Sequence, residues 1–593
     1  FATFICGASR SGKSNLLQVL LTSIFTNYHP DDIEVWLIDF KMTEFSRYIK
    51  HPAPHIRYLI LDDSPDIVCD IVDRLTEILK KRQNIFKGRW KKLDEVPIDH
   101  YMPTMFILID EFSVMSEVIA NADGDYRAKM QMLLAKGAAL GMRFIFSSQG
   151  FTSGTACLND FSKKQIQQRI AMKTEVDEIK QTLDLRNASD KDSQLMNELP
   201  VYYALQRIPQ TASGDHLLNV QILNISDDNM EEQQLEKIDY MNSLYIPVIN
   251  TYIKDDPSFY LDKQWLYIDG TSYLSFYKMI PEMDKFLSEN IYELSSYDET
   301  ALFLGEPRKL ISLSPIYLSN NYCENMLLIS PDNEEDPAAS IFISMFYMLE
   351  KQGHEAEVWS APKNKLFKKL TKIKDDLSYS EGLEEICQRI QNIRKAIEQR
   401  TIHKKFFVLL GFDVLMSEMQ FLQSDKSDKS DSSDSYQSHE DFYEMIMNYC
   451  DPDIELDDTF INNNEISNIS EQNALIYNAC DDIKYILTNG PKLGYHFIMQ
   501  FSNQYSFSQI KMNPDLFRHK IFFKISESDA SEFYISRPNQ LTIAKLPSHN
   551  FRYTNGLESL TFRPYLHKGL KWDGWIVLDD GNVDIERVEE YLL

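Results

Sequence analysis

The sequence GASRSGKS at positions 7–14 limits the possible folds of the chain more than any other stretch. An apolar run precedes it and a helical pattern of leucines follows it, so we expect a strand, a tight turn and a helix. Glycines let such a turn curl with its amide groups inward, and the positive N-terminus of the next helix favours anions. The stretch therefore predicts a phosphate-binding P-loop rather than an ordinary glycine-rich turn.

The loop also predicts which side chains hold a nucleotide. Lys13 is expected to bind the β- and γ-phosphates, and the Ser14 hydroxyl is expected to bind Mg²⁺. The other predicted nucleotide-binding residues are those of the loop and of the first helical turn, namely Gly7, Ala8, Ser9, Arg10, Ser11, Gly12 and Asn15.

A second stretch, at positions 105–112, is an apolar run that ends in two carboxylates. A buried parallel strand has this composition, and its carboxyl end lies at the sheet edge where phosphates bind. Asp110 is therefore expected to anchor Mg²⁺, and Glu111 to polarise the attacking water as the catalytic base. The alternative is a strand followed by an acidic helix cap, and the P-loop upstream favours the catalytic interpretation.

Two more polar residues are catalytic candidates. Gln149 ends the predicted strand that begins at Met142, where it is placed to sense the γ-phosphate or is simply a strand-end glutamine. Arg169 lies in the next predicted strand. It would either reach a neighbouring subunit's site as an arginine finger or form a salt bridge at the strand edge.

Composition sets limits on the architecture. The chain has 593 residues, and because single cores seldom grow beyond about 250–300 residues, several domains are expected. Its net charge of -28 opposes indiscriminate binding to polyanions or acidic lipid surfaces, although a local basic channel could still hold DNA. The apolar runs are strand-sized, shorter than the roughly 18 residues of a membrane span. The seven scattered cysteines contain no C-x-x-C pair and indicate reduced thiols in the cytosol.

From about position 300 the order of predicted strands and helices in the first half is repeated, but the predicted nucleotide-binding and catalytic residues are not. The run at 325–329 resembles the opening strand, but the aligned loop has Asp336 where the first half has Lys13. Further carboxylates that would repel a triphosphate follow the same strand, at Asp332, Glu334 and Glu335. Later, Gly411 and Phe412 take the places of the two catalytic carboxylates. The sequence therefore predicts an internal duplication with a degenerate second copy.

The predicted domain organisation has three parts. Residues 1–225 form an active domain, residues 226–299 form linking elements, and residues 300–593 form the degenerate domain. A low-complexity Ser/Asp/Lys insertion near 423–441 interrupts the last part, because this composition cannot bury a core.

Taken in order, these segments resemble the motor domain of the FtsK/SpoIIIE family within the FtsK-HerA group. The resemblance rests on the P-loop and on the stretches 37–44, 109–112, 137–141, 147–149 and 168–170. It implies an α/β fold of two tandem RecA-like P-loop NTPase domains with central, mostly parallel sheets. It also implies an ATPase that uses ATP and Mg²⁺ and assembles as a homo-oligomeric ring, usually a hexamer, with the nucleotide between subunits.

The tandem arrangement is similar to that of type VII secretion ATPases, which implies a translocase motor for protein export. A translocase of double-stranded DNA is the alternative, because residues 39–44 are closer to the DNA pumps of the family. A third possibility is a scaffold ordered by nucleotide, against which the intact Lys13, Asp110 and Glu111 argue. Because the chain begins inside a predicted core strand, we expect a further region upstream. The resemblance to type VII secretion motors implies cytoplasmic domains that are attached through such a region to the inner face of a bacterial membrane. Expected partners are secretion components and an exported protein, or DNA.

Overall fold

The computed structural model describes residues 2–97, 102–122, 124–185, 190–208, 216–225, 228–244, 266–270, 273–311, 313–361, 364–374, 377–381, 383–411, 482–503, 507, 512–571, 575–578 and 581–585. The chain forms two compact units. Unit 1 comprises Phe1–Ser272 and Lys309–Ser312, and unit 2 comprises Tyr273–Arg308 and Leu313–Leu593. The low-complexity insertion predicted near 423–441 lies outside the described residues.

Unit 1 is built on a nine-stranded sheet. Its strands, in chain order, are β1 (Ala2–Cys6), β2 (Ile33–Asp39), β3 (Ile56–Leu61), β4 (Thr104–Asp110), β5 (Met142–Ser148), β6 (Ile166–Met172), β7 (Tyr203–Ile208), β8 (His216–Gln221) and β9 (Leu266–Asp269). Across the sheet the order is β8-β7-β6-β1-β5-β4-β2-β3-β9. The pairs from β6 to β9 are parallel, whereas β7 and β8 are antiparallel to their neighbours. The carboxyl ends of β1, β4 and β5 therefore meet at one edge.

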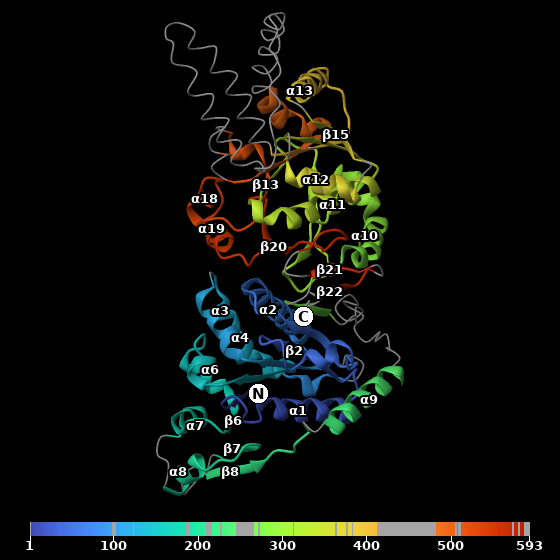
Figure 1. Cartoon of the computed structure of the whole chain (residues 1–593). Coiled ribbons are helices and arrows are strands. Elements are labelled where there is room, and N and C mark those ends of the chain that lie inside the picture. Colours follow the sequence, from blue (N-terminus) through green and yellow to red (C-terminus); the bar gives the residue numbers. More distant parts are fainter. Residues whose placement is uncertain are drawn as a thin grey trace, which may run out of the picture. The chain divides into compact units, whose positions relative to one another are not determined.

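Helices cover both faces of this sheet (Figure 1). They are α1 (Lys13–Asn27), α2 (Pro65–Phe86), α3 (Phe112–Asn121), α4 (Tyr126–Lys136), α5 (Phe151–Gly154), α6 (Asp160–Gln165), α7 (Val176–Leu183), α8 (Asp190–Asn197) and α9 (Asp228–Leu244), with short 3-10 turns η1 (Ser46–Ile49), η2 (Leu93–Glu95) and η4 (Gly137–Leu140). On β1, Phe4 packs with α2, α3 and α4 on one face, and Ile5 packs with α1 and α9 on the other. This alternation is the two-residue period of a strand that is buried on both faces.

Unit 2 repeats this sheet. Its strands are β10 (Glu299–Leu302), β11 (Glu306–Pro307), β12 (Ile316–Ser319), β13 (Met326–Ile329), β14 (Glu355–Ser360), β15 (Ser378–Glu381), β16 (Lys405–Leu410), β17 (Tyr495–Phe501), β18 (His519–Phe522), β19 (Phe551–Thr554), β20 (Ser559–Arg563), β21 (Trp575–Val577) and β22 (Val583–Ile585). The main sheet has the order β11-β20-β19-β18-β13-β17-β16-β14-β15, and β10-β12 and β21-β22 form two smaller sheets. Strand for strand, β19-β18-β13-β17-β16-β14-β15 corresponds to β7-β6-β1-β5-β4-β2-β3. The predicted α/β class with two mostly parallel sheets is confirmed.

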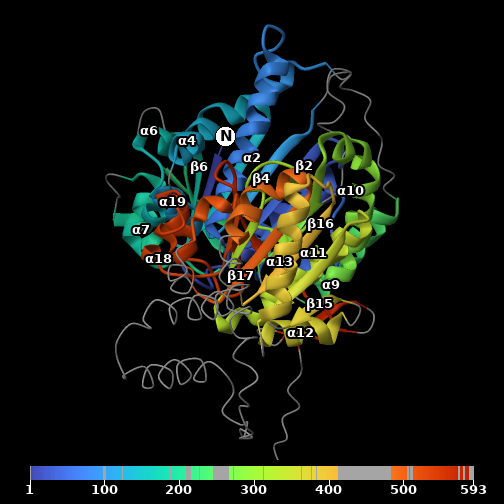
Figure 2. The same cartoon turned by 90° about the horizontal axis from the view of Figure 1, so that it is seen from above.

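The helices of unit 2 follow the same plan. They are α10 (Phe276–Tyr297), α11 (Glu335–Lys351), α12 (Lys365–Ile373), α13 (Leu383–Glu398), α18 (Glu527–Ser531) and α19 (Arg537–Ala544), with 3-10 turns η6 (Asp332–Glu334), η7 (Pro491–Leu493) and η8 (Pro514–Leu516). α11 and α12 pack on one face of the sheet with Leu328 and Val408, and α13 packs on the other with Leu327 and Leu409 (Figure 2). α11 thus occupies the place that α1 has in unit 1.

The segment 226–299, which the sequence assigns to linking elements, divides between the two units. α9 packs on unit 1 through Ile238, and β9 extends the unit 1 sheet by pairing with β3. α10 belongs to unit 2, where Phe276 and Met283 join the core. Among the described residues, no helix is both long and apolar enough to cross a membrane.

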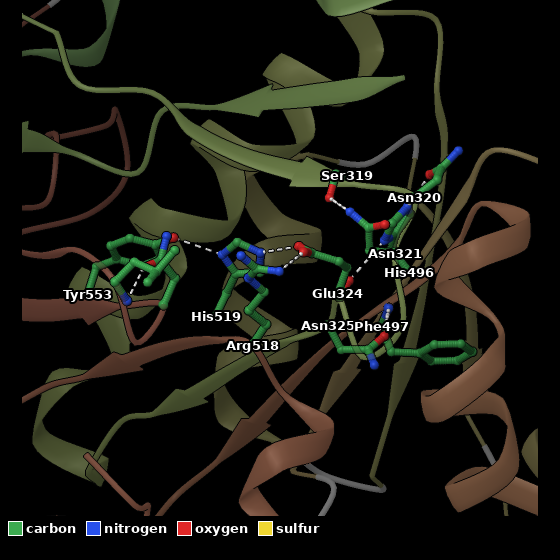
Figure 3. A network of polar contacts seen from close by, with 12 residues as sticks. Ser319, Asn320, Asn321, Glu324, Asn325, His496, Phe497, Arg518, His519 and Tyr553 are labelled. Atoms are coloured by element: carbon green, nitrogen blue, oxygen red, sulfur yellow. Dashed lines mark hydrogen bonds and ion pairs between the residues drawn. The ribbon is translucent and has the colours of Figure 1, made fainter. Parts of the chain in front are cut away.

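A buried polar network links three neighbouring strands at one edge of the unit 2 sheet (Figure 3). The Glu324 carboxylate, just before β13, contacts His519 Nε2 at 2.6 Å and Arg518 at 3.0 Å. His519 Nδ1 contacts the Tyr553 hydroxyl at 2.8 Å. Burial raises the pKa of Glu324, but the hydrogen bond and charge of His519, with the charge of Arg518, outweigh burial and hold that pKa below its ordinary value. The network therefore links β13, β18 and β19 through side chains as well as through the sheet.

Candidate nucleotide site

The loop between β1 and α1 has the backbone of a tight curl. Arg10 and Gly12 have positive φ angles of 62° and 100°. Glycine is needed at position 12, because a Cβ there would also lie 2.9 Å from Cδ1 of Tyr202. The Gly7 amide donates to the Ser148 carbonyl at 3.3 Å, which anchors the loop to the end of β5.

Lys13 begins α1 and lies across the loop. Its Nζ donates to the carbonyl oxygens of Gly7 at 2.5 Å and Ala8 at 3.3 Å. Burial lowers the pKa of Lys13, and the charges of Asp110 and Glu111 oppose that shift. The predicted phosphate-binding amine and the two predicted catalytic carboxylates are therefore brought within electrostatic reach of one another.

Asp110 ends β4 beside Asp39, the last residue of β2. Its side chain is almost fully buried, and burial raises the pKa of Asp110 to about 6, with a further upward push from the charges of Asp39 and Glu44. An ionised carboxylate in such a position is stabilised by a cation. This environment fits the metal-binding role that the sequence predicts for Asp110.

Glu111 caps α3 and is surrounded by hydrogen-bond donors. Lys41 forms an ion pair with Oε2, Gln149 Nε2 donates to Oε2 at 3.3 Å, and the Ser113 hydroxyl donates to Oε1 at 2.7 Å. Burial raises the pKa of Glu111, but the hydrogen bonds of Lys41, Ser113 and Gln149 outweigh burial and hold it below its ordinary value. The structure thus brings Gln149 to the predicted base, and its γ-phosphate sensing stays a prediction.

The loop after β2 contributes residues to which the sequence analysis gave no role. The Asp39 carboxylate accepts hydrogen bonds from successive backbone amides, those of Lys41, Met42, Thr43, Glu44 and Phe45, at 2.7–3.2 Å. The Ser14 hydroxyl donates to the Glu44 carboxylate. The available signal was a carboxylate that ends a strand. The long-range contacts of its loop, from Lys41 to Glu111 and from Ser14 to Glu44, depend on how the strands and α1 pack.

Two predicted site residues bind backbone groups within unit 1. The Asn15 side chain donates to the Leu223 carbonyl at 2.6 Å and accepts from the Ile225 amide at 2.8 Å, which holds the chain after β8 against α1. The Arg169 guanidinium stacks on Phe151 and donates to carbonyls of residues 163, 166 and 182 at 2.8–3.3 Å. Nucleotide contact by Asn15 and the arginine-finger role of Arg169 stay predictions.

The groups at this edge fit a magnesium-bound nucleoside triphosphate. The first turn of α1 carries no acidic residue, so its N-terminus remains favourable for anions. The buried Ser11 hydroxyl has no hydrogen-bond partner among the described residues. With the Lys13 amine, the Ser14 hydroxyl and the Asp110 carboxylate, the donor set combines phosphate-binding groups with oxygen ligands of the kind Mg²⁺ prefers.

The equivalent turn of unit 2 has a different chemistry. Lys369 pairs with Glu335 at 3.1 Å and with Asp336 at 2.5 Å, and His549 contacts Glu334 at 2.7 Å. These carboxylates, expected from the sequence to repel a triphosphate, therefore have positively charged or hydrogen-bonding partners inside the unit. Glu335 and Asp336 still occupy the first turn of α11, where they compete with any other anion.

The strand ends of unit 2 are joined by a glutamine. Gly411, which follows β16 at the place of Asp110, donates its amide to Gln500 Oε1 at 2.9 Å. Gln500 Nε2 donates to the Ser330 hydroxyl at 3.0 Å. Phe412, predicted to replace Glu111, lies outside the described residues. In unit 2 the uncharged side-chain amide of Gln500 thus bridges the sheet edge that corresponds to the edge of unit 1 where Asp110 and Glu111 lie.

Comparisons with known proteins identify relatives of unit 1. Residues 2–219 match the FtsK/SpoIIIE family. The ESX-1 secretion system protein EccCb1 of Mycobacterium tuberculosis is 25% identical over 189 residues, which cover 30% of this chain and 31% of the relative. The DNA translocase SftA of Bacillus subtilis is 24% identical over 153 residues, which cover 24% of this chain and 15% of the relative. The matches thus span less than a third of either relative.

A solved structure extends the likeness to both units. The cytoplasmic domain of the type VII secretion ATPase EccC of Thermomonospora curvata superposes with a TM-score of 0.59 at 13% sequence identity, covering 95% of this chain and 60% of that chain. At this identity the superposition shows a shared fold. Residues 2–219, which contain the P-loop, are thus an FtsK/SpoIIIE-type ATPase domain that is homologous to the ATPases of type VII secretion systems.

Proposed function

We propose that unit 1 hydrolyses magnesium-bound ATP and that the chain uses this energy to drive protein export in a type VII-like secretion system. The observation that carries the proposal is the arrangement of the sheet, in which parallel pairing of β1 with β5 and of β5 with β4 puts the loop of Lys13 and the Asp110-Glu111 pair at the same carboxyl edge. A scaffold that merely binds nucleotide would not need a base beside the metal-binding carboxylate.

Each side chain has a task in this reaction. Lys13 binds the β- and γ-phosphates, and Ser14 and Asp110 hold the metal. Bound Mg²⁺ supplies positive charge that stabilises the charge developing on the phosphates. Glu111 polarises the attacking water, and Gln149, which hydrogen-bonds to Glu111, helps to orient that water. In a ring, an arginine of the neighbouring subunit, with Arg169 as the candidate, would stabilise the same charge.

The proposed cargo is an exported protein. Its support is the similarity of unit 1 to EccCb1 and the shared fold of both units with a type VII secretion ATPase. The net charge of -28 also suits a protein cargo better than a polyanion. We propose a homo-oligomeric ring, such as a hexamer, that works with secretion partners at the inner face of a bacterial membrane.

A DNA translocase is the second candidate, and the similarity of unit 1 to SftA favours it. The two cargoes differ in how ATP turnover responds to DNA. A DNA motor is stimulated by duplex DNA, and the stimulation falls steeply with salt, because binding releases counterions.

The test is ATP turnover by the full chain, with the Lys13→Ala variant as the control. We expect turnover in the wild type, none above background in Lys13→Ala, and no stimulation by duplex DNA at any salt concentration. Turnover that survives in Lys13→Ala would remove the ATPase proposal. Salt-sensitive stimulation by DNA would favour the translocase over the secretion motor.

A further inference from the structure

The loop after β2 is held rigidly by one buried carboxylate. Asp39 is fully buried and accepts hydrogen bonds from the amides of residues 41–45 through its two oxygens. Each of these charge-assisted bonds is stronger than a bond between neutral groups. Residues 40–45, here called the Asp39-capped loop, therefore present their side chains at fixed positions.

Two side chains of this loop contact the proposed catalytic base and the proposed metal ligand of the P-loop helix. Lys41 forms its ion pair with Glu111, and the Glu44 carboxylate accepts a hydrogen bond from the Ser14 hydroxyl. The Lys41 side chain is 45% exposed, whereas that of Glu111 is 8% exposed. Lys41 is therefore the partner that can swing into solvent, because its long stem is flexible and water can solvate its ammonium group.

The Lys41 contact limits what Glu111 can do. Both carboxylate oxygens of Glu111 are engaged by protein donors, Oε1 by Ser113 and Oε2 by Lys41 and Gln149. A water that Glu111 polarises must donate a hydrogen bond to one of these oxygens. Each carboxylate oxygen has about two lone pairs. Oε1 accepts from Ser113, whereas Oε2 accepts from both Lys41 and Gln149, so a water that binds at Oε2 competes with Lys41.

The Glu44 contact has the opposite effect on Ser14. A serine hydroxyl has one proton to donate and two lone pairs to offer. Because the proton is directed to Glu44, the lone pairs of the oxygen remain available to a cation. Glu44 thus selects the hydroxyl orientation that a metal ligand requires.

We propose that Lys41 and Glu44 are positioning residues of the nucleotide site. Lys41 restrains Glu111 until the attacking water displaces it, and Glu44 orients the Ser14 hydroxyl for the metal. Asp39 couples the two actions by fixing both residues on one loop. The inference rests on the proposed ATPase function and deepens it, since neither residue is assigned contact with the reacting atoms.

The first test compares Lys41→Gln with Lys41→Arg in the full chain, with Lys50→Gln as a control because Lys50 is an exposed lysine of the same unit. We expect Lys41→Gln to raise kcat by about threefold, because the competing cation is gone. KM and the Kd for a fluorescent ATP analogue should stay within about twofold of wild type, since Lys41 is not a phosphate ligand. Lys41→Arg and Lys50→Gln should behave as wild type.

The inference fails for Lys41 if kcat is unchanged or falls, or if nucleotide affinity is lost, which would make Lys41 a direct ligand. Circular dichroism and melting curves check folding, and Lys41→Met carries the same expectation should Lys41→Gln fold poorly. A different result would contradict the proposed function, namely a wild-type chain that shows no ATP turnover dependent on Lys13. If the wild type shows such turnover and Lys41→Gln has the same kcat as wild type, only the inference about Lys41 is overturned.

The second test titrates Mg²⁺ into the full chain with the fluorescent ATP analogue and needs no turnover. Glu44→Gln should raise the Mg²⁺ midpoint by about tenfold, in the range found when a group that orients a metal ligand is removed. Binding of the analogue in EDTA should not change, because Glu44 orients only the metal ligand. The exposed Glu232 provides the matched control Glu232→Gln. An unchanged Mg²⁺ midpoint, or equal losses with and without Mg²⁺, contradicts the role of Glu44.

Discussion

Glu111 adopts a left-handed backbone conformation, with φ of 51°, between β4 and α3. For a residue with a side chain this conformation costs on the order of 1–3 kcal/mol and persists only where surrounding contacts impose it. Here those contacts are the Ser113 hydroxyl and the Lys41 ammonium on its carboxylate. The residue with the strained backbone is thus also the proposed catalytic base, so a substitution that tests its role should change its size as little as possible.

Glu111→Gln is such a change, and we expect it to separate nucleotide binding from turnover. The amide keeps the size of the carboxylate but cannot accept a proton, so kcat should fall by roughly 10²–10⁴-fold. The Kd for a fluorescent ATP analogue should change little, because Lys13 and Ser14 are intact. Hydrolysis at the wild-type rate would show that another residue is the base.

Gly12→Ala tests the loop backbone. The new Cβ would meet Tyr202 at 2.9 Å in a conformation with φ of 100°, so the loop must move or strain. We expect a stability loss of about 1–2 kcal/mol, seen as a lower melting temperature, together with weaker nucleotide binding. Gly88→Ala is the matched control, since φ there is 74° but a Cβ would meet nothing within 4 Å. Equal nucleotide affinities in the two variants would show that the loop tolerates a side chain.

At this scale, motif spacing was enough to single out Lys13, Ser14, Asp110 and Glu111 as candidates. It was not enough for Lys41 and Glu44. Their partners, Glu111 and Ser14, lie 70 and 30 residues away along the chain. The pairing of β2 with β4 brings Lys41 to Glu111, and the packing of α1 with the loop after β2 brings Ser14 to Glu44. A long-range contact of this kind leaves no local signal in a single sequence.

Among the elements, the strands with long apolar runs were predictable, as were α1 and α2. The neighbours of each strand were not, because chain order does not give sheet order: β1 lies between β5 and β6. The sequence analysis did not predict β9. This strand has four residues, and it is defined by its pairing with β3. Tertiary pairing, rather than local propensity, decides such short elements.

The network of Figure 3 makes a prediction about the strands it joins. Glu324→Gln removes the charged partner of His519 inside unit 2, where Glu324 and His519 are almost fully buried. We expect unit 2 to lose about 3 kcal/mol of unfolding free energy, as when one partner of a buried pair is removed. Hydrogen exchange of β13 and β18 amides in the full chain measures this loss. The exposed Glu558 supplies the control Glu558→Gln, which should leave exchange in both strands as in wild type.

The same pair predicts how the stability of unit 2 depends on pH. Because the folded pKa of Glu324 lies below its ordinary value of 4.5, the folded state binds fewer protons than the unfolded state as the pH falls past 4.5. The stabilisation by Glu324 is complete above this pH and is lost as the pH falls through the folded pKa. The difference in hydrogen exchange between wild type and Glu324→Gln should therefore shrink in acid, and a difference that grows would contradict the assigned charge state.

For the whole molecule, two units with the same strand order but different turns predict one nucleotide per chain. Calorimetry with a slowly hydrolysed ATP analogue and Mg²⁺ should give a stoichiometry near one, because Glu335 and Asp336 occupy the start of α11 in unit 2. Lys13→Ala should abolish the signal. Residual micromolar binding in that variant would assign a second site to unit 2.

The hydrogen bonds of Gln500 bear on any attempt to engineer a nucleotide site into unit 2. Asp336→Lys would supply an amine, and Gly411→Asp would supply a carboxylate, but the Gly411 amide and the Ser330 hydroxyl would still be tied to Gln500. The new groups would enter a scaffold whose amide bridge already satisfies the hydrogen bonds of the strand tips. A nucleotide site in unit 2 would therefore also require replacing Gln500, so we expect no single substitution to create one.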